Sequence, residues 1–187
     1  MIAIRQTSPP LFAPLLGVAL LASAGVPADA HAAYQGADDP ASKTLSNAAR
    51  NATLCLLNKE RRGRGLSGLK AHADLRQAAK KHTRRMISQD CFSHTCSGEA
   101  DLSKRIEATS YLSCNCSWSV GENIGYGYGS KSTPKWMVEA WMDSSGHREN
   151  ILNGSFEHIG IGVESGSPTG GSDQRAATYT TTFGARG

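Results

Sequence analysis

Three short segments of the chain carry side chains that could do chemistry. They are Phe92-Ser93-His94-Thr95, Gly121-Glu122-Asn123-Ile124 and the run from Ser144 to Leu152, which contains His147. Imidazole and carboxylate groups are common in proton transfer and in metal binding. A single loop histidine is more often a surface or hydrogen-bonding residue, so it is the combination of the three segments that predicts a site.

Five cysteines bear on how such a site is held. Four of them lie within residues 91–116, at Cys91, Cys96, Cys114 and Cys116. A bond between Cys114 and Cys116 would close a very small loop, so we favour cross-pairing of the two clusters, which would tie the His94 loop to the Glu122 segment. The pairing itself stays open. A zinc site made by the same four thiols fits less well, because their spacings are unlike those of the usual zinc knuckles.

The N-terminus predicts export. An apolar run from Leu11 to Val26 is followed by Ala28-Asp29-Ala30, which has the small-x-small pattern of a signal-peptidase site. The run is shorter than the roughly 20 residues of a membrane-spanning helix. We therefore expect a secreted protein without a transmembrane segment after cleavage, in a compartment where disulfides persist. The expected parts are a signal peptide over 1–30, a flexible linker over 31–43 and one domain over 44–187.

Composition excludes two classes of protein. With 39% hydrophobic and 19% charged residues, the 187-residue chain suits a globular domain rather than a disordered one. Lys and Arg total 20 against 16 for Asp and Glu, a formal net charge of +4, and the predicted leader removes one residue of each kind, Arg5 and Asp29. This excess is too weak to indicate a nucleic-acid partner. We expect a monomer.

Helices are predicted mainly in the first half of the chain. Apolar residues at intervals of three and four indicate one amphipathic helix from about Leu45 to Gly63 and a second around Leu75 to Met86. A shorter helix is expected over Leu102–Ala108. Another should begin at Pro134, with Thr133 as its N-cap. Cys55 falls in the apolar stripe of the first helix, and we expect it to be a free thiol.

Strands are predicted mainly in the second half. Ile124–Tyr128, Ile159–Val163 and Thr178–Phe183 alternate or are rich in β-branched and aromatic residues, and a hairpin-like connection covers Gly166–Asp173. Helices that come first and strands that come last indicate an α+β fold rather than alternating βαβ units. We expect a central antiparallel sheet that is covered by helices.

The order of several motifs resembles the CAP superfamily, named for cysteine-rich secretory proteins, antigen five and pathogenesis-related one proteins. The blocks span about Leu45 to Gly184, and the compact one from Trp141 to Leu152 is similar to the bacterial branch. They are Leu57-Asn58-x-x-Arg61, His82, Phe92-Ser93-His94, Gly121-Glu122-Asn123-Ile124, Trp141-Met142-x-Ser144-x-Gly146-His147-Arg148-x-Asn150-Ile151-Leu152, Ile159-Gly160-Ile161-Gly162 and Tyr179 to Gly184. The resemblance implies an α-β-α sandwich with a cavity lined by two histidines and two acidic residues.

His94 and His147 match the two histidines of the family, and Glu122 matches its first glutamate. The second glutamate is absent, because Ser144 stands three residues after Trp141, where the family has it. Asp143 and Glu139 are poor substitutes for this glutamate, since both point in other directions around the helix. The expected cavity therefore contains His94, Glu122 and His147, with Asp143 or Ser144 at the fourth position.

Some members of the family hold a divalent cation such as zinc at this site. In this chain, a cation would have the two imidazoles and at most Glu122 or water as ligands. Such an incomplete shell would bind weakly. We expect no required cofactor and treat zinc as an optional ligand of His94 and His147.

Three functions are compatible with these residues. The favoured one is a non-enzymatic module that binds a small hydrophobic, lipid, peptide or cell-envelope ligand, because no nucleophile adjoins a histidine in a recognisable elbow or triad. The alternative is a secreted, protease-like hydrolase, in which His94, Glu122 and His147 act with a metal, or Ser93 or Ser144 acts as a nucleophile. The third is a structural envelope protein in which the same residues only hold loops together.

The other polar residues are predicted to be structural. His82 falls on the apolar face of the second helix, which favours a satisfied core histidine over a ligand. His158 precedes a strand and has no evident acidic partner, and His72 is expected to be solvated. Asn123 and Asn150 are suited to hydrogen bonds with loop backbone, so we expect them to support the site.

Overall fold

A computed structural model describes residues 36–40, 46–114, 116–170 and 175–187. The predicted signal peptide and most of the predicted linker lie outside the described residues. Four strands form one sheet in the order β1-β3-β4-β2, with β1 at Lys70–Ala71, β2 at Trp118–Tyr128, β3 at His158–Ser165 and β4 at Ala176–Arg186. The three long strands run antiparallel, and β1 pairs in parallel with the start of β3, so the sheet is mixed.

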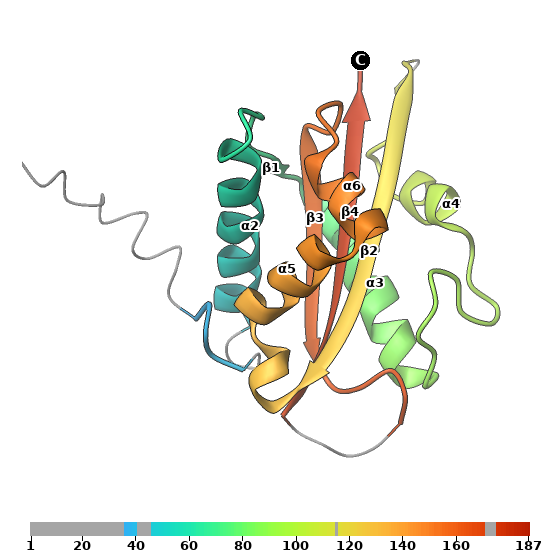
Figure 1. Cartoon of the computed structure of the whole chain (residues 1–187). Helices are drawn as coiled ribbons and strands as arrows, with labels where there is room; N and C mark the ends of the chain where they lie inside the picture. Colours follow the sequence, from blue (N-terminus) through green and yellow to red (C-terminus); the bar gives the residue numbers. More distant parts are fainter. Residues whose placement is uncertain (1–35, 41–45, 115, 171–174) are drawn as a thin grey trace, which may run out of the picture.

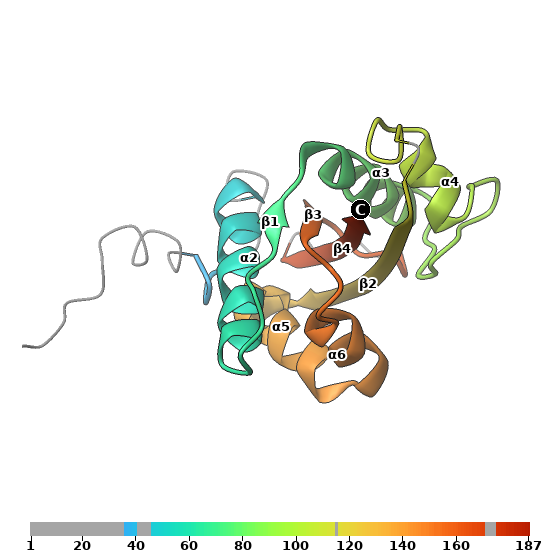
Figure 2. The same ribbon diagram turned by 90° about the horizontal axis from the view of Figure 1, so that it is seen from above.

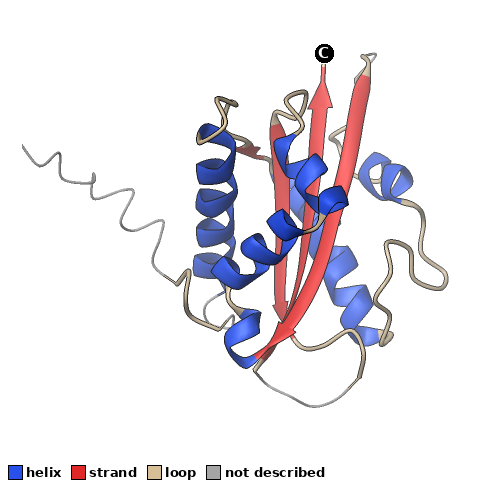
Figure 3. Cartoon of the chain, viewed as in Figure 1, coloured by secondary structure: helices blue, strands red, loops and turns tan. Residues whose placement is uncertain are grey.

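Helices cover both faces of this sheet. Figure 2 shows α3 (Ala73–Ser88) and α4 (Leu102–Glu107) on one side and α5 (Pro134–Asp143) and α6 (Ser145–Leu152) on the other. Helix α2 (Ser46–Arg62) packs against α5 and β3 beside the β1 edge (Figure 1). The α+β class and the α-β-α sandwich are confirmed, as the colouring by secondary structure makes clear (Figure 3).

The alternation of Ile159-Gly160-Ile161-Gly162-Val163 divides β3 between the two layers. Its isoleucines and valine join the main core with residues of α2, α5 and α6, such as Leu57 and Trp141. Its glycines face α3, which lies so close that a Cβ at Gly160 would meet the backbone of Leu75 and Arg76 at 2.0 and 2.1 Å. Side chains are excluded there by contact with backbone, so α3 can lie directly on the strand.

Buried Arg61 fixes the chain between α6 and β3. Its guanidinium donates hydrogen bonds to the carbonyl oxygens of Ile151 and Asn153, both at 2.8 Å, and of Phe156 at 3.1 Å. Burial lowers the pKa of Arg61. The side chain therefore replaces water as the partner of backbone groups that a loop would otherwise leave unpaired.

Most predicted elements are present, and the missed ones are short. Thr133 caps α5 by accepting a hydrogen bond from the backbone N–H of Trp136 at 3.2 Å, and α2 ends immediately before Gly63. The sequence did not reveal β1, the 3₁₀ turn η1 (Gly129–Ser132) or α6. In the described part of the chain, no helix is long and apolar enough to cross a membrane.

Candidate functional site

The loop after α3 presents His94 to solvent beside β2. The side chain of His94 is 57% exposed, and its Nδ1 lies 2.9 Å from Oε1 of Glu122, whose side chain is 2% exposed. Glu122 lies in the middle of β2, an edge strand of the sheet. The structure thus brings together a buried carboxylate and an exposed imidazole, as the sequence motifs had indicated.

The disulfides differ from the cross-pairing that we favoured. Cys91 bonds Cys96, with Cα atoms 6.0 Å apart, and Cys114 bonds Cys116, with Cα atoms 5.2 Å apart. The prediction was wrong because it judged loop size alone, whereas both Cα separations lie within the usual range for a disulfide. The His94 loop is closed on itself, and no disulfide joins it to the Glu122 segment. Cys55 is a free thiol, as expected, and is half-buried.

Arg105 of α4 makes the connection that the disulfides do not. Its Nη2 donates to Oε2 of Glu122 at 2.5 Å, and its Nη1 donates to the carbonyl oxygen of His94 at 2.7 Å. The Arg105 side chain is 7% exposed, so these hydrogen bonds are largely shielded from solvent. Arg105 was not predicted from the sequence, because its place on a short basic helix resembles that of any solvated arginine.

A second buried carboxylate, Glu99, lies behind the first. Both of its oxygens are close to Nδ1 of His82, at 3.0 and 2.9 Å, and one is 3.6 Å from Nη1 of Arg105. His82 is fully buried, and its Nε2 lies 3.8 Å from Glu122 without a hydrogen bond. The core position predicted for His82 is confirmed, while Glu99 had not been recognised. We call Glu99, His82, Arg105, Glu122 and His94 the charged network.

His147 reaches the same strand from α6. The side chain of Asn123 donates to the carbonyl oxygen of His147 at 3.0 Å, and Asn150 donates to the carbonyl oxygen of Glu122 at 3.2 Å. Burial lowers the pKa of His147, and the positive charge of His94 lowers it further. The two asparagines hold site backbone as predicted.

The fourth position of the expected cavity is not filled by an acidic side chain. Ser144 lies at the junction of α5 and α6. Asp143 lines a different hollow, of about 500 Å³, together with Leu56 of α2 and Met142 of α5. The assignment of Asp143 or Ser144 to the fourth position therefore stays a prediction.

The residues of the site do not fit a zinc centre. Both oxygens of Glu122 are already engaged, one by His94 and one by Arg105. Among the described residues, no group of three or more His, Cys, Asp or Glu side chains is arranged to hold a metal ion. Structural and catalytic zinc sites normally have at least three protein ligands.

Aromatic rings lie next to the His94 loop. Phe92 and Tyr126 meet edge to face with ring centroids 4.8 Å apart, and Tyr126 meets Tyr128 at 5.9 Å. Phe92 is 44% exposed and Tyr128 39%. Glu122, Tyr126 and Tyr128 share one face of β2, because their numbers differ by even steps. The rings form a partly exposed row, which we call the aromatic row and which was not predicted from the sequence.

The other two described histidines, His72 and His158, are held by local contacts. His158 Nδ1 lies 3.1 Å from the hydroxyl of Tyr111, and its ring meets that of His72 edge to face. His72 caps α3 by accepting from the backbone N–H of Asp74 at 3.3 Å, so it is half-buried rather than solvated. Both lie away from the site, at the β1 end of β3.

Family comparison agrees with this architecture. The cysteine-rich secretory protein family, CAP, matches residues 54–182. The chain therefore belongs to the CAP family, and its relatives include bacterial proteins.

Two curated relatives come from Bacillus subtilis (strain 168). The uncharacterized protein YkwD is 40% identical over 116 residues, which cover 60% of this chain and 41% of the relative. The uncharacterized membrane protein YlbC is 30% identical over 122 residues, which cover 65% of this chain and 33% of the relative. The chain thus spans well under half the length of these relatives.

Solved structures share the fold at low sequence identity. An extracellular protein containing an SCP domain from Bacillus anthracis str. Ames superposes with a TM-score of 0.62 at 24% identity, over 75% of this chain and 41% of that chain. An outer surface protein from Borrelia burgdorferi gives a TM-score of 0.56 at 19% identity, over 70% of this chain and 87% of that one. These likenesses support the fold alone.

Proposed function

We propose that this protein is a secreted, non-enzymatic CAP module that binds a small ligand of the cell envelope at the edge of β2. The observation that carries the proposal is the engagement of both Glu122 oxygens, by His94 and by Arg105. A carboxylate held in this way positions the imidazole and is not free to act as a general base. The site therefore offers the fixed imidazole of His94 for hydrogen bonding, rather than an imidazole and a carboxylate that act together in catalysis.

The aromatic row indicates which kind of ligand suits this site. Phe92 lies in the same disulfide-closed loop as His94, and Tyr126 follows Glu122 on the same face of β2. Exposed rings favour a ligand with an apolar or ring-shaped face, and the imidazole adds a polar contact. A sugar ring or a lipid chain of the envelope has this combination.

The geometry offers less support for the hydrolase alternative. The hydroxyl of Ser93 donates to the carbonyl oxygen of Thr95 at 3.1 Å. In the described residues, no hydrogen bond joins Ser93 or Ser144 to His94 or His147. A nucleophile and its base normally lie within hydrogen-bond reach of one another.

Calorimetry of the purified protein tests the proposal with two probes, soluble muropeptides and palmitate. We expect saturable binding of one probe, weakened at least tenfold by Phe92→Ala and by His94→Ala. Trp118→Ala is the matched control, because Trp118 is also 44% exposed and lies at the other end of β2. Its binding should equal that of the unchanged protein.

Two results would overturn the proposal. One is the absence of saturable binding for both probes. The other is cleavage of a muropeptide, followed by mass spectrometry, that is lost in His147→Ala while the variant stays folded, since this would establish the hydrolase.

A further inference from the structure

At the opposite edge of the sheet, most of β3 has no partner strand among the described residues. The backbone N–H groups of Lys70 and His72 donate to the carbonyl oxygens of Glu157 and Ile159, so these carbonyl oxygens point toward β1. Even-numbered residues point toward β4, as the hydrogen bond from Gly166 to Ala176 shows. Strand geometry alternates, and the N–H and C=O groups of Ile161 and Val163 therefore point outward beyond the end of β1.

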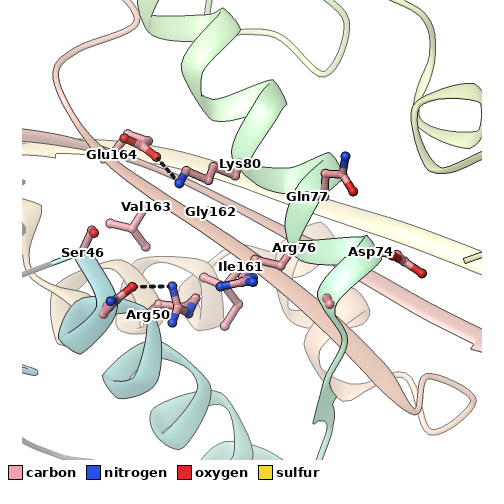
Figure 4. A pocket seen from close by; sticks show the side chains of 12 residues that line it. Ser46, Arg50, Asp74, Arg76, Gln77, Lys80, Ile161, Gly162, Val163 and Glu164 are labelled. Atoms are coloured by element: carbon pink, nitrogen blue, oxygen red, sulfur yellow. Dashed lines mark hydrogen bonds and ion pairs between the residues drawn. The ribbon is translucent and has the colours of Figure 1, made fainter. Parts of the chain in front are cut away.

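Two helices turn this open edge into a groove. Two adjoining hollows of about 390 and 270 Å³ run along β3, with α2 on one side and α3 on the other. Figure 4 shows Ile161 and Val163 between Arg50 of α2 and Lys80 of α3. In the described structure, only the two residues of β1 pair with this edge of β3. The groove therefore offers strand-pairing groups and a path for an extended chain.

Among the described residues that line the groove, basic side chains outnumber acidic ones. Arg50 and Arg76 both line the two hollows. The pKa of Arg50 is lowered mainly by burial, and the positive charge of Arg76 lowers it further. The guanidinium of Arg50 donates to the side-chain oxygen of Asn47 at 2.8 Å. Arg76 has no side-chain hydrogen bond or ion pair with any described residue. The other charged side chains of the groove are Lys80 and Glu164, 3.9 Å apart, and Asp74, which lies 3.9 Å from Nδ1 of His72.

We propose that this groove binds an extended peptide segment that carries a carboxylate side chain. The peptide would pair with the free backbone groups of Ile161 and Val163 as an added strand. Its carboxylate would lie between Arg50 and Arg76, where an anion relieves the repulsion of two like charges, and guanidinium groups bind carboxylates well. This site is separate from the His94 site, so either proposal can fail without the other.

Amide hydrogen exchange tests the open edge without any ligand. In the purified protein, the N–H groups of Ile161 and Val163 should exchange much faster than those of Gly160 and Gly162, which pair with β4. Equal protection of all four would show that another part of the chain already covers the edge, and this would overturn the proposal.

A peptide titration tests the occupant. The probe is the capped peptide Thr-Val-Thr-Glu-Val-Thr, compared with the same peptide carrying Lys in place of Glu, and with a version whose alternate backbone nitrogens are methylated. We expect saturable NMR shifts at Ile161 and Val163 with the first peptide at millimolar concentration. The Lys peptide should bind at least fivefold more weakly, and the methylated peptide should not bind.

Variants assign the charge selectivity to the two arginines. Arg50→Gln combined with Arg76→Gln should make the Glu and Lys peptides bind equally. The matched control is Arg62→Gln combined with Lys81→Gln, one exposed position on each of the same two helices, which should leave the fivefold preference unchanged. If neither peptide shifts these amides, or if the control abolishes the preference as well, the proposal is wrong.

Discussion

The two edges of the sheet handle charge in opposite ways. At the β2 edge, the carboxylates of Glu99 and Glu122 are buried and lie against Arg105 and histidine rings. At the β3 edge, Arg50 and Arg76 face a groove as like charges. A site whose charges are compensated within the protein is rigid before any ligand arrives. At a site with unbalanced charge, a partner of opposite charge can still form favourable electrostatic interactions.

The edges also share a support. Helix α3 carries His82 toward the charged network and Arg76 toward the groove. It lies directly on Gly160 and Gly162 of β3. A change that moves α3 should therefore disturb both edges, whereas a change in one set of charges should stay local.

The largest expected effect is the loss of stability when Arg105, the arginine of the charged network, is replaced. Arg105→Met removes the guanidinium group and leaves the carboxylates of Glu99 and Glu122 buried. Removing one partner of a buried ion pair typically lowers the free energy of unfolding by about 3–5 kcal/mol. Urea unfolding of the purified protein measures this free energy. The control, Arg84→Met, removes an exposed arginine that lies 3.2 Å from Glu164 and should cost about 1 kcal/mol or less. Similar costs for both variants would contradict the contrast between the edges.

A smaller effect should follow from displacing α3. Gly160→Ala places a methyl group against the backbone of Leu75, and overpacking of this kind costs about 1–3 kcal/mol. NMR shift changes should reach both His82 and Arg76. In contrast, the methyl group of Gly146→Ala, in the first turn of α6, meets no atom within 4 Å and should change stability by at most about 0.5 kcal/mol. Shifts confined to one edge would show that α3 does not couple them.

Reversing one charge in the groove should stabilise the free protein slightly. Arg76→Glu places a carboxylate near Arg50, and partly exposed ion pairs contribute about 0.2–1 kcal/mol. The same variant should bind the Glu-containing peptide more weakly, because the carboxylate position is then occupied from within. Thermal unfolding measures the gain, with Lys81→Glu as the control. A loss of stability would mean that the two guanidinium groups do not repel each other.

The smallest expected effect concerns pH at the β1 end of β3. Burial lowers the pKa of His158, and the neighbouring His72 lowers it further. The native state therefore binds fewer protons than the unfolded state between that lowered value and the ordinary pKa of about 6.5. Stability should decrease as pH falls through this interval. In an NMR titration, His72→Asn should raise the pKa of His158, and an unchanged value would refute the assigned cause.

The fold could be predicted from the sequence where the pattern is local. The spacing of Leu75 to Met86 gives α3, Thr133 before Pro134 gives the start of α5, and the alternation from Ile159 to Val163 gives β3. Two-residue β1 and polar α6 have too little periodicity to be recognised. Their positions depend on partners distant in the chain, such as Arg61.

The part of the candidate site that could be predicted is the part that lies in local sequence motifs. His94, Glu122 and His147 stood out by their motifs, and the fold brings them to one strand. Arg105 and Glu99 carry no such signal, because a charged side chain on a short helix or loop is usually solvated. The disulfide partners were misjudged, since loop size says little about where the Cα atoms lie.

The sequence by itself determined the layers, because hydrophobic periodicity and capping act over a few neighbouring residues. It also determined which side chains are available for binding. Only the tertiary structure decided which charges meet, because burial and the distance between segments set the strength of electrostatic interactions. That is why one set of charged residues became a compensated network at β2, and another became an open groove at β3.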